Sequence, residues 1–500
     1  MFDIFMSGLA QIFDWKILIF MNIGLLIGII FGAIPGLTGN LGIIIFLPFS
    51  FAMEPATSII FLMAIYIGGE LGGSVSGILI GTPGTNAGAA TMLDGYPLAK
   101  KGHGKKALLS AFLSSTVGGV ISAIVLLIAA PSIANFTIHF GPPEYFALAI
   151  FGLSIIAGIS GKNMYKGLIA GCIGVLLSMV GMDNMSGSLR FTFESVKLMN
   201  GLPLLPLLIG IFAIPSIMEK TESKKSDKVS EKIKMNENDT LTKEDIKRTT
   251  PAMLKGSLIG TIIGAIPGAG TGIASFISYD EARRSSKNSR NFGKGELEGV
   301  AASESANNGV VAASLIPLLT LGIPGSPAAA VLIGAFMIQG MVPGPTLFQD
   351  QGVIVYTIMI GILIASIFMY LQGRVLAKYF VKVTHVPHQI MVPVLVLMCT
   401  AGAFAADDSV FGMKVFIIFG IMSYILMKLD FPAVPIVLGF VLGPLLEFNL
   451  RRSLVMSEGE WSIFFTRPIS LVFIVITLVI LIYSTIKSKK ENNELLDESI

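Results

Sequence analysis

Long apolar runs, separated by short polar or charged clusters, dominate the chain from end to end. In the first half the runs cover residues 58–80, 107–130, 145–161, 165–181 and 201–218. In the second half they cover residues 310–333, 352–372, 389–405, 411–428, 432–446 and 468–486. A helix needs about 20 mostly apolar residues, with a lower limit of about 17, to cross the hydrocarbon of a bilayer. The pattern therefore predicts an all-α polytopic membrane protein.

Two motifs occur twice and interrupt this apolar pattern at matching places. GLLIGIIFGAIPG covers Gly24–Gly36 and returns as GSLIGTIIGAIPG at Gly256–Gly268. GTPGTNAGA begins at Gly81, and GIPGSPAAA begins at Gly322. Apolar segments interrupted in corresponding positions of two halves are typical of a transporter whose broken helices meet at a substrate site. We therefore expect two structural repeats with re-entrant or broken helices at the Pro-Gly motifs.

Lys and Arg residues in the connecting segments indicate how the two halves face the membrane. The segments 94–106, 219–255 and 281–296 are basic, whereas the segment 341–352 contains no Lys or Arg. Basic loops are retained in the cytoplasm. The basic loop follows the second Pro-Gly motif in the first half but precedes it in the second half. This difference predicts inverted-topology repeats, related by an axis in the membrane plane.

The basic segments 219–255 and 281–296 are both expected in the cytoplasm, but they lie too close together in the sequence for two full membrane crossings between them. Only about 25 residues separate them, whereas two spans need about 40. We expect residues 253–280 to enter the membrane and return on the same side, with Pro267 and Gly268 at the tip. By symmetry, residues 17–52 do the same from the outside, which puts the N-terminus outside. A kinked single span there would put it inside.

This topology divides the chain into five parts. Residues 1–218 form the first membrane repeat, residues 219–252 a charged cytoplasmic linker, and residues 253–450 the second membrane repeat. Residues 451–486 form an additional C-terminal span, and residues 487–500 form a cytoplasmic tail.

The composition of the chain agrees with a membrane location. Of the 500 residues, 53% are hydrophobic and 13% are charged, whereas a soluble domain carries about 25% charged residues. The net charge of +3 is small, so no nucleic-acid partner is expected. The partner that the composition indicates is the lipid bilayer.

Each Pro-Gly motif exposes backbone groups that can bind ions. Proline removes a helical hydrogen bond and glycine tolerates unusual dihedrals, so one half-helix ends and another begins. The new N-terminus carries a partial positive charge and binds anions. The expected substrate-binding residues are Pro35, Gly36, Thr38, Asn40, Thr82, Pro83, Gly84, Thr85, Asn86, Pro267, Gly268, Gly270, Thr271, Pro324, Gly325 and Ser326. The alternative is that these residues serve only helix packing and kinks.

Two acidic residues fall inside the apolar segments. Glu70 lies within the run 58–80, and Glu304 precedes Asn307 and Asn308 by about one turn. Ionisable groups at membrane depth are costly and are usually functional. We expect Glu70, Glu304, Asn307 and Asn308 to contribute to a coupling-ion site for Na⁺ or H⁺. The alternative is a neutral glutamic acid hydrogen-bonded to a neighbouring helix, with the asparagines bridging helices.

No set of residues in the sequence indicates an enzyme. GKGE at Gly293 lacks the spacing of a nucleotide-binding P-loop. His385 and His388 have no acidic partner nearby, so we expect no metal site, no cofactor and no catalytic residues. Transport energy must then come from an ion gradient or from another subunit. An ion or solute channel lined by the same broken helices and a membrane-embedded scaffold or enzyme component are the alternatives.

Several longer segments carry motifs that are more specific than the breaks alone. They are GAIPGL from Gly32, GGSVSGILIGTPGTNAGAATMLDGYPLAKKG from Gly72, GPPEYFALAIFGL from Gly141, GMDNMSGSLRFTF from Gly181, IPGAGTGIASFISYDEARR from Ile266, FGKGELEGVAASESANN from Phe292, LTLGIPGSPAAAVLIGAF from Leu319 and LGPLLEFNLRRSL from Leu442. Over nearly its whole length the chain resembles the large membrane subunit (TctA-type) of tripartite tricarboxylate transporters. Family motif positions correspond here to Pro35, Gly36, Pro83, Gly84, Pro267, Gly268, Glu304, Asn307, Asn308, Pro324 and Gly325. Glu70 departs from the family pattern, in which a tyrosine is common just before the Gly-Gly-Ser sequence.

The resemblance implies secondary active import of organic tricarboxylate or dicarboxylate anions, coupled to a Na⁺ or H⁺ gradient. It also implies two protein partners, a small membrane subunit and an extracytoplasmic solute-binding protein. The implied location is the prokaryotic cytoplasmic (inner) membrane.

Overall fold

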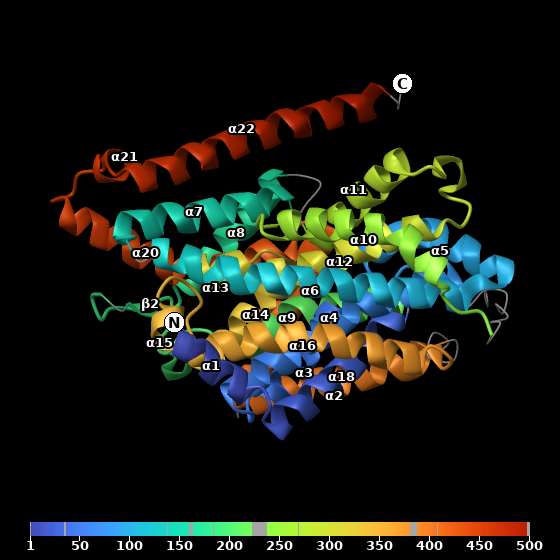
Figure 1. Cartoon of the computed structure of the whole chain (residues 1–500). Helices are drawn as coiled ribbons and strands as arrows, with labels where there is room; N and C mark the ends of the chain where they lie inside the picture. The colour runs from blue at the N-terminus through green and yellow to red at the C-terminus, as the bar shows by residue number, and fades with distance from the viewer. Residues whose placement is uncertain are drawn as a thin grey trace. The chain divides into compact units, whose positions relative to one another are not determined.

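The computed structural model describes residues 2–34, 37–137, 139–159, 164–183, 185–222, 238–268, 270–380, 388–407 and 409–497. These residues are mostly α-helical, with one short β-hairpin, which confirms the expected all-α fold class (Figure 1). They divide into two compact units. One unit contains Met1–Ala134 and Glu219–Met398, and the other contains Asn135–Met218 and Cys399–Ile500. The part of the predicted linker at residues 223–237 lies outside the described residues.

The first unit contains most of the helices around the Pro-Gly motifs. Its elements are α1 (Phe2–Gln11), α2 (Trp15–Ala33), α3 (Gly39–Ser50), α4 (Pro55–Ile80), α5 (Asn86–Leu98), the π-helical turn η1 (Ala99–His103), α6 (Gly104–Thr137), α10 (Lys243–Gly264), α11 (Gly270–Ser285), the 3₁₀ turn η3 (Ser289–Asn291), α12 (Leu297–Ala313), α13 (Leu315–Leu321), α14 (Pro327–Ile338), α15 (Leu347–Asp350), α16 (Gly352–Leu376) and α18 (His388–Asp407). The ends of α6 and α18 continue into the second unit.

The second unit contains the other helices and a short β-hairpin. Its elements are α7 (Pro142–Ile159), α8 (Met164–Ser178), β1 (Gly181–Met182), β2 (Leu189–Arg190), the 3₁₀ turn η2 (Val196–Leu198), α9 (Leu204–Glu222), α19 (Val410–Lys428), α20 (Ala433–Met456), α21 (Ile463–Thr466) and α22 (Pro468–Asp497). The two strands are antiparallel, with Gly181 opposite Arg190. Helix α20 packs against both α7 and α8.

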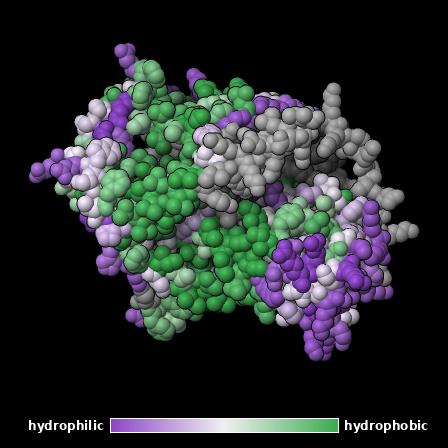
Figure 2. All heavy atoms as spheres, turned by 90° about the horizontal axis from the view of Figure 1, so that it is seen from above, coloured by the Kyte–Doolittle hydropathy of each residue, from purple (hydrophilic) through white to green (hydrophobic). Residues whose placement is uncertain are grey.

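Six helical segments among the described residues are long and apolar enough to cross a membrane. They are Trp15–Ala33, Pro55–Ile80, Asn86–Thr137, Gly352–Leu376, Val410–Lys428 and Ala433–Met456. Large apolar side chains are also exposed at the surface, and Figure 2 shows hydrophobic residues over much of the face in view. Apolar surface of this extent is expected where lipid is the solvent. The chain is therefore a multi-pass membrane protein.

Within the predicted apolar run 310–333 the helix is interrupted twice, at the expected break from Gly322 and also earlier, between Ala313 and Leu315. Helix α12 ends at Ala313, α13 covers only Leu315–Leu321, and α14 begins at Pro327. Pro317 has no backbone N–H for the Ala313 carbonyl, so the helix cannot continue unchanged through this point. Gly322 then adopts a left-handed conformation with φ 74° and ends α13.

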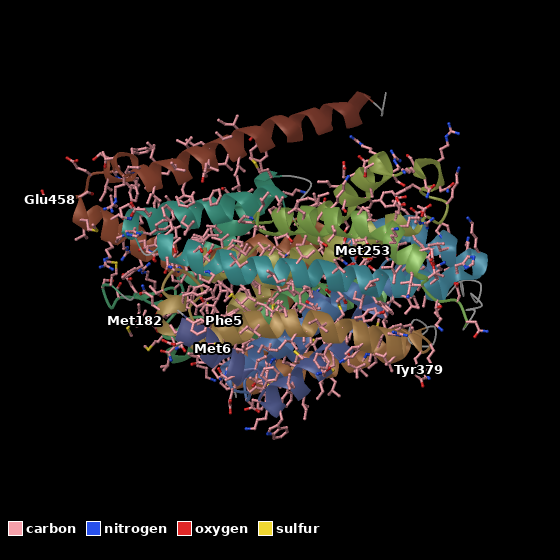
Figure 3. All side chains as sticks on the ribbon, in the orientation of Figure 1. Phe5, Met6, Met182, Met253, Tyr379 and Glu458 are labelled. Carbon is pink, nitrogen blue, oxygen red and sulfur yellow. The ribbon has the colours of Figure 1, made fainter. Side chains whose placement is uncertain are left out.

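Helix α4 forms the core of the first unit. Every residue from Ala56 to Leu79 is buried, and α2, α3, α5, α12, α14 and α16 all pack against α4. A helix that is apolar and buried all round belongs inside a bundle. At the edge of the unit, α1 packs on α16, where the rings of Phe5 (Figure 3) and Tyr356 meet edge to face, 5.9 Å apart.

Candidate functional site

Helical structure stops at all four Pro-Gly motifs, and a new helix begins directly after each. We number the interruptions by their position in the chain: break 1 covers residues 34–38, break 2 residues 81–85, break 3 residues 265–269 and break 4 residues 322–326. Four helix N-termini, those of α3, α5, α11 and α14, therefore begin at the breaks. The first amides of each helix have no partner within the helix, so these ends carry partial positive charge.

Breaks 2 and 4 have the same local geometry. Gly81 and Gly322 end α4 and α13 in left-handed conformations, with φ 67° and 74°. Thr85 and Ser326 then cap α5 and α14, because their hydroxyl oxygens accept the backbone N–H groups of Gly88 and Ala329, respectively, at 3.1 Å. The two predicted hydroxyl residues are thus N-caps in the described structure. A hydroxyl that accepts such a bond still carries its own proton to donate.

Breaks 1 and 3 also match the predicted positions, although each includes residues that are not described. Thr38 caps α3 by accepting the N–H of Leu41 at 3.2 Å. In break 3, Gly268 has φ 82°, and Gly270 at the start of α11 has φ 73°. These left-handed values explain why glycine occupies both positions. Pro35 and Gly36 lie outside the described residues.

The other predicted residues differ in their exposure. Thr82 and Asn86 are exposed and Pro83 is partly buried, whereas Pro267, Pro324 and Gly325 are buried. Asn40 is partly buried, and its Oδ1 atom is buried without a hydrogen-bond partner.

Helix α2, which leads to break 1, and helix α10, which leads to break 3, both use glycines to pack closely against a neighbouring helix. Three glycines of α2, four residues apart, approach the backbone of α4 so closely that a Cβ atom would overlap it. The pairs are Gly24 with Phe61, Gly28 with Ile65, and Gly32 with Gly69. In the second half, α10 packs on α12 through Gly256 with Ala302, Gly260 with Ala306, and Gly264 with Val310. Small residues at this spacing let membrane helices pack backbone to backbone. The two halves therefore repeat one packing arrangement in the same register (α2 and α4, α10 and α12 in Figure 1).

A short stretch of α4, residues 66–73, contacts both breaks of the first half. Gly69 packs against the backbone of Gly39, the first residue after break 1. One turn later, Gly73 packs against the Thr85 side chain of break 2. The Gly73 carbonyl also accepts the backbone N–H of Gly84 at 3.0 Å.

The same stretch of α4 contacts both breaks of the second half. The Tyr66 hydroxyl donates to Ser326 Oγ in break 4 at 3.2 Å. Thr271, in the first turn after break 3, donates through Oγ1 to Glu70 Oε2 at 3.3 Å. Breaks 3 and 4 also touch directly, because the Gly268 N–H donates to the Gly325 carbonyl at 3.1 Å. Residues 66–73 of α4 therefore contact the N-terminal ends of all four helices that begin after the breaks.

The two predicted acids have different surroundings. Glu304 of α12 is fully buried, and its carboxylate accepts hydrogen bonds from Ser74, from Thr91 at 2.5 Å and from Ser115 at 2.8 Å. These three hydroxyls come from α4, α5 and α6. Glu70 is 6% exposed, and Thr271 is the one side chain whose hydrogen bond to its carboxylate is found among the described residues. Sequence patterns did not reveal Ser74, Thr91 or Ser115, because each lies far from Glu304 in the chain.

The two predicted asparagines lie beside these acids. Asn307 donates through Nδ2 to the Glu70 backbone carbonyl at 3.3 Å. Its Oδ1 atom and both polar atoms of Asn308 are buried without a hydrogen-bond partner. Buried polar atoms without partners are costly and are retained chiefly for a purpose. The structure therefore brings Glu70, Asn307 and Glu304 into one buried polar cluster, with Asn308 next to it in the sequence.

A family model described as the tripartite tricarboxylate transporter TctA family matches residues 18–438, a range that includes all four breaks. The chain belongs to the tripartite tricarboxylate transporter TctA family. The TctA-type resemblance predicted from the motifs is thus confirmed, and the chain is a component of a tricarboxylate transporter.

Two relatives of this TctA-family chain come from Agrobacterium vitis. One, described as an uncharacterized 52.8 kDa protein in the TAR-I ttuC' 3' region, is 36% identical over 472 residues, which cover 94% of each chain. The other, described as an uncharacterized protein in the TAR-II ttuC' 3' region, is 37% identical over 225 residues, which cover 44% of this chain and 93% of the relative. No solved structure matches the chain significantly.

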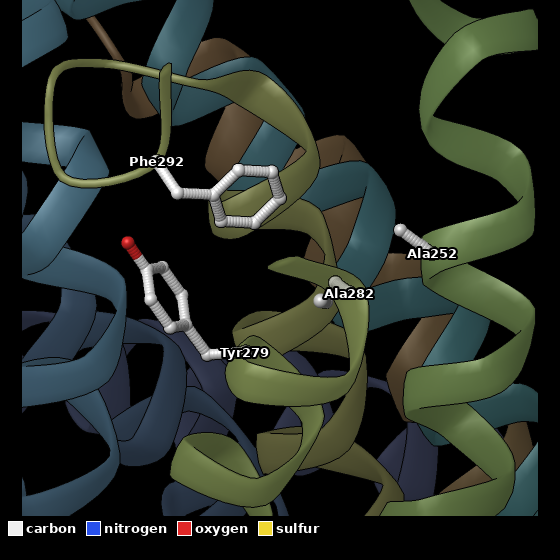
Figure 4. Packing of buried hydrophobic residues seen from close by; sticks show 5 residues of the cluster. Ala252, Tyr279, Ala282 and Phe292 are labelled. Atoms are coloured by element: carbon white, nitrogen blue, oxygen red, sulfur yellow. The ribbon is translucent and has the colours of Figure 1, made fainter. Parts of the chain in front are cut away.

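Asp94, in the TctA-family segment DGYPLAKKG, is a buried residue that the sequence patterns did not single out. Its carboxylate accepts the Tyr279 hydroxyl at 2.9 Å and the backbone N–H groups of Gly295 and Glu296 at 2.8 Å. Tyr279 packs edge to face against Phe292, as Figure 4 shows. Asp94 therefore fastens α5 of the first half to α11 and to the segment before α12. The only sequence signal was its position in that motif.

Two other family motifs meet in the second unit. Asp183, in the loop between β1 and β2, pairs with Arg190 at 2.7 Å and with Arg451 of α20 at 2.8 Å. Glu447 pairs with the same two arginines at 2.8 Å. Hydrogen bonds from Ser186, the Met185 amide and both arginines hold the pKa of Asp183 well below its usual range, although burial opposes this shift. These ion pairs join the two motifs to each other.

Proposed function

We propose that this TctA-family chain is the large permease subunit of a tripartite uptake system that imports small organic anions, with tricarboxylates and dicarboxylates as the cargo class. The observation that carries this proposal is the meeting of four helix N-termini at residues 66–73 of α4. Four partial positive charges and the adjacent hydroxyls suit several carboxylate groups on one small molecule. Membership of a transporter family supports this proposal, which assigns the chain no catalytic role.

The proposal includes a specific membrane topology. The two halves are inverted repeats, α10 and α11 form a re-entrant hairpin with break 3 at its tip, and α2 and α3 form its counterpart. The repeated glycine packing of α2 on α4 and of α10 on α12 supports two equivalent halves. The basic segments 94–106 and 281–296 support opposite orientations. Residues 219–252 and 487–500 would then be cytoplasmic, in the inner membrane of a prokaryote.

The proposed system also needs components beyond this chain. A small membrane subunit completes the permease, and an extracytoplasmic solute-binding protein delivers the anion. A gradient of H⁺ or Na⁺ supplies the energy, since no residue pattern in the chain indicates nucleotide binding. Movement of the hairpins against the other helices would expose the breaks alternately to each side.

Reconstituted uptake tests the proposal directly. The three components are placed in proteoliposomes, and a panel of radiolabelled carboxylates is added while the Na⁺ gradient and the pH are varied independently. We expect concentrative uptake of at least one tricarboxylate or dicarboxylate that depends on the binding protein and on one ion gradient. Passive equilibration without a gradient requirement would indicate a channel, and absence of any carboxylate flux would contradict the proposal.

A further inference from the structure

The two buried carboxylates of the polar cluster differ in how completely protein groups surround them. Glu304 accepts hydrogen bonds on both oxygen atoms, and its three hydroxyl partners, Ser74, Thr91 and Ser115, come from three helices of the first half. None of these partners lies in a break. Glu304 lies in the second half, so these hydrogen bonds stabilise the packing of the two halves against each other. Protonation of the carboxylate would weaken all three hydrogen bonds at once.

Glu70 is placed differently, at the point where the breaks meet. It lies on α4 between Tyr66, which contacts break 4, and Gly73, which contacts break 2. Its carboxylate has one hydrogen bond from a described side chain, the 3.3 Å contact with Thr271 next to break 3. A buried carboxylate with so few partners is costly in its charged form. An ionised Glu70 would also repel an anion bound at the surrounding helix N-termini.

We propose that Glu70 takes up the coupling proton together with the anionic cargo, whereas Glu304 is a structural residue. This inference rests on the proposed function, because it names the coupling group of the same site. The proton moves from the outer solution to a Glu70 carboxylate oxygen, which removes the negative charge beside the cargo, and leaves on the inner side with the cargo. A proton needs only this one carboxylate. A metal ion needs several ligands, and the described residues contain no group of three or more His, Cys, Asp or Glu side chains that could hold one.

The other ionisable groups near Glu70 are few. Glu304 of α12 and Tyr66, one turn earlier on α4, interact with Glu70 electrostatically. Helices α3 and α14 contain no ionisable residue. The ionisable residues elsewhere on the helices packed against α4 are Lys16, Asp94, Tyr96, Glu298, Tyr356, Tyr370 and Arg374. On α11 the first ionisable residue is Tyr279, two turns beyond Thr271, and it is bound to Asp94.

Glu70→Gln separates coupling from cargo movement, because glutamine keeps the size of the side chain but cannot take up a proton. In proteoliposomes with all three components, we expect the wild type to accumulate labelled carboxylate under an inward proton gradient. The variant should lose this accumulation and retain exchange of labelled for unlabelled cargo without a gradient. Glu70→Asp, which can still titrate, should recover part of the accumulation. Glu304→Gln should lower the thermal stability and impair accumulation and exchange together.

Cargo binding provides a second measurement that does not require transport. With a dicarboxylate that stays fully ionised over the pH range, wild-type affinity from thermal-shift titration should fall by up to about tenfold per pH unit as Glu70 ionises. The affinity of the Glu70→Gln variant should not change with pH. Three results would overturn this inference. The Glu70→Gln variant could accumulate cargo under a proton gradient, its affinity could show the same pH dependence as that of the wild type, or only a Na⁺ gradient could drive uptake by the wild type. A wild type that neither exchanges nor binds any carboxylate would instead contradict the proposed function.

Discussion

At the scale of single residues, the hydroxyl side chains at three of the breaks are helix N-caps. Thr38, Thr85 and Ser326 each accept a backbone N–H at the start of a helix. The Ser/Thr-rich sequence after each Pro-Gly predicted their positions, because N-caps and ligand contacts favour the same residue types. Their tertiary partners could not be predicted. Tyr66, which donates to Ser326, is 260 positions away in the chain.

Thr85→Val tests whether a break hydroxyl contacts cargo. Valine keeps the shape but removes the hydroxyl, so we expect the apparent Kd of the carboxylate to rise about tenfold or more, because a hydrogen bond to a charged group contributes about 1.5–3 kcal/mol. Binding is measured by thermal-shift titration in detergent. Loss of the N-cap alone should cost about 0.5–2 kcal/mol of stability. Ser409→Ala, which removes the cap of α19 in the other unit, controls for this loss. Equal affinity in wild type and Thr85→Val would show that the hydroxyl only caps the helix.

At the scale of elements, glycine spacing sets how the helices of each half pack. The sequence showed the repeat and the four-residue spacing of its glycines, and a membrane setting favours small residues at helix contacts. The sequence could not show which helix each row of glycines packs against, because the contacts with Phe61 of α4 and Ala302 of α12 depend on the whole fold. The apolar run 310–333 shows a related limit: the Pro-Gly motif predicted the end of a helix at Gly322, but the uninterrupted hydropathy gave no sign of the earlier interruption between Ala313 and Leu315.

Gly28→Ala and Gly260→Ala form a matched pair for this packing. Each added Cβ would overlap a carbonyl oxygen, of Ile65 or of Ala306 respectively. We expect each variant to lose about 1–3 kcal/mol of stability, as overpacked cores do, and to melt at a lower temperature in detergent. Gly104→Ala, whose Cβ would have its nearest atom at an ordinary 3.5 Å, should melt like the wild type. If only one of the two glycines is sensitive, the two halves do not share the same packing.

At the scale of the whole molecule, the chain is an all-α, multi-pass membrane protein of the TctA family. Hydropathy, the duplicated motifs and the longer family segments predicted this much, because each is written locally in the sequence. The sequence predicted that the broken helices meet at one site, but it did not predict that the site lies at residues 66–73 of α4. Its members Tyr66, Gly69 and Gly73 carry no signal of their own beyond an apolar, glycine-rich run. The inverted orientation of the halves stays a prediction, because it is a property of the chain in its membrane.

A structure of the chain determined with a bound tricarboxylate or dicarboxylate tests the central claim most directly. We predict that the carboxylate oxygens of the cargo lie within hydrogen-bond distance of first-turn amides or cap hydroxyls at the breaks, with contacts from both halves and with Glu70 adjacent. Cargo bound elsewhere in the protein, with the four helix N-termini contacting only protein, would contradict the account.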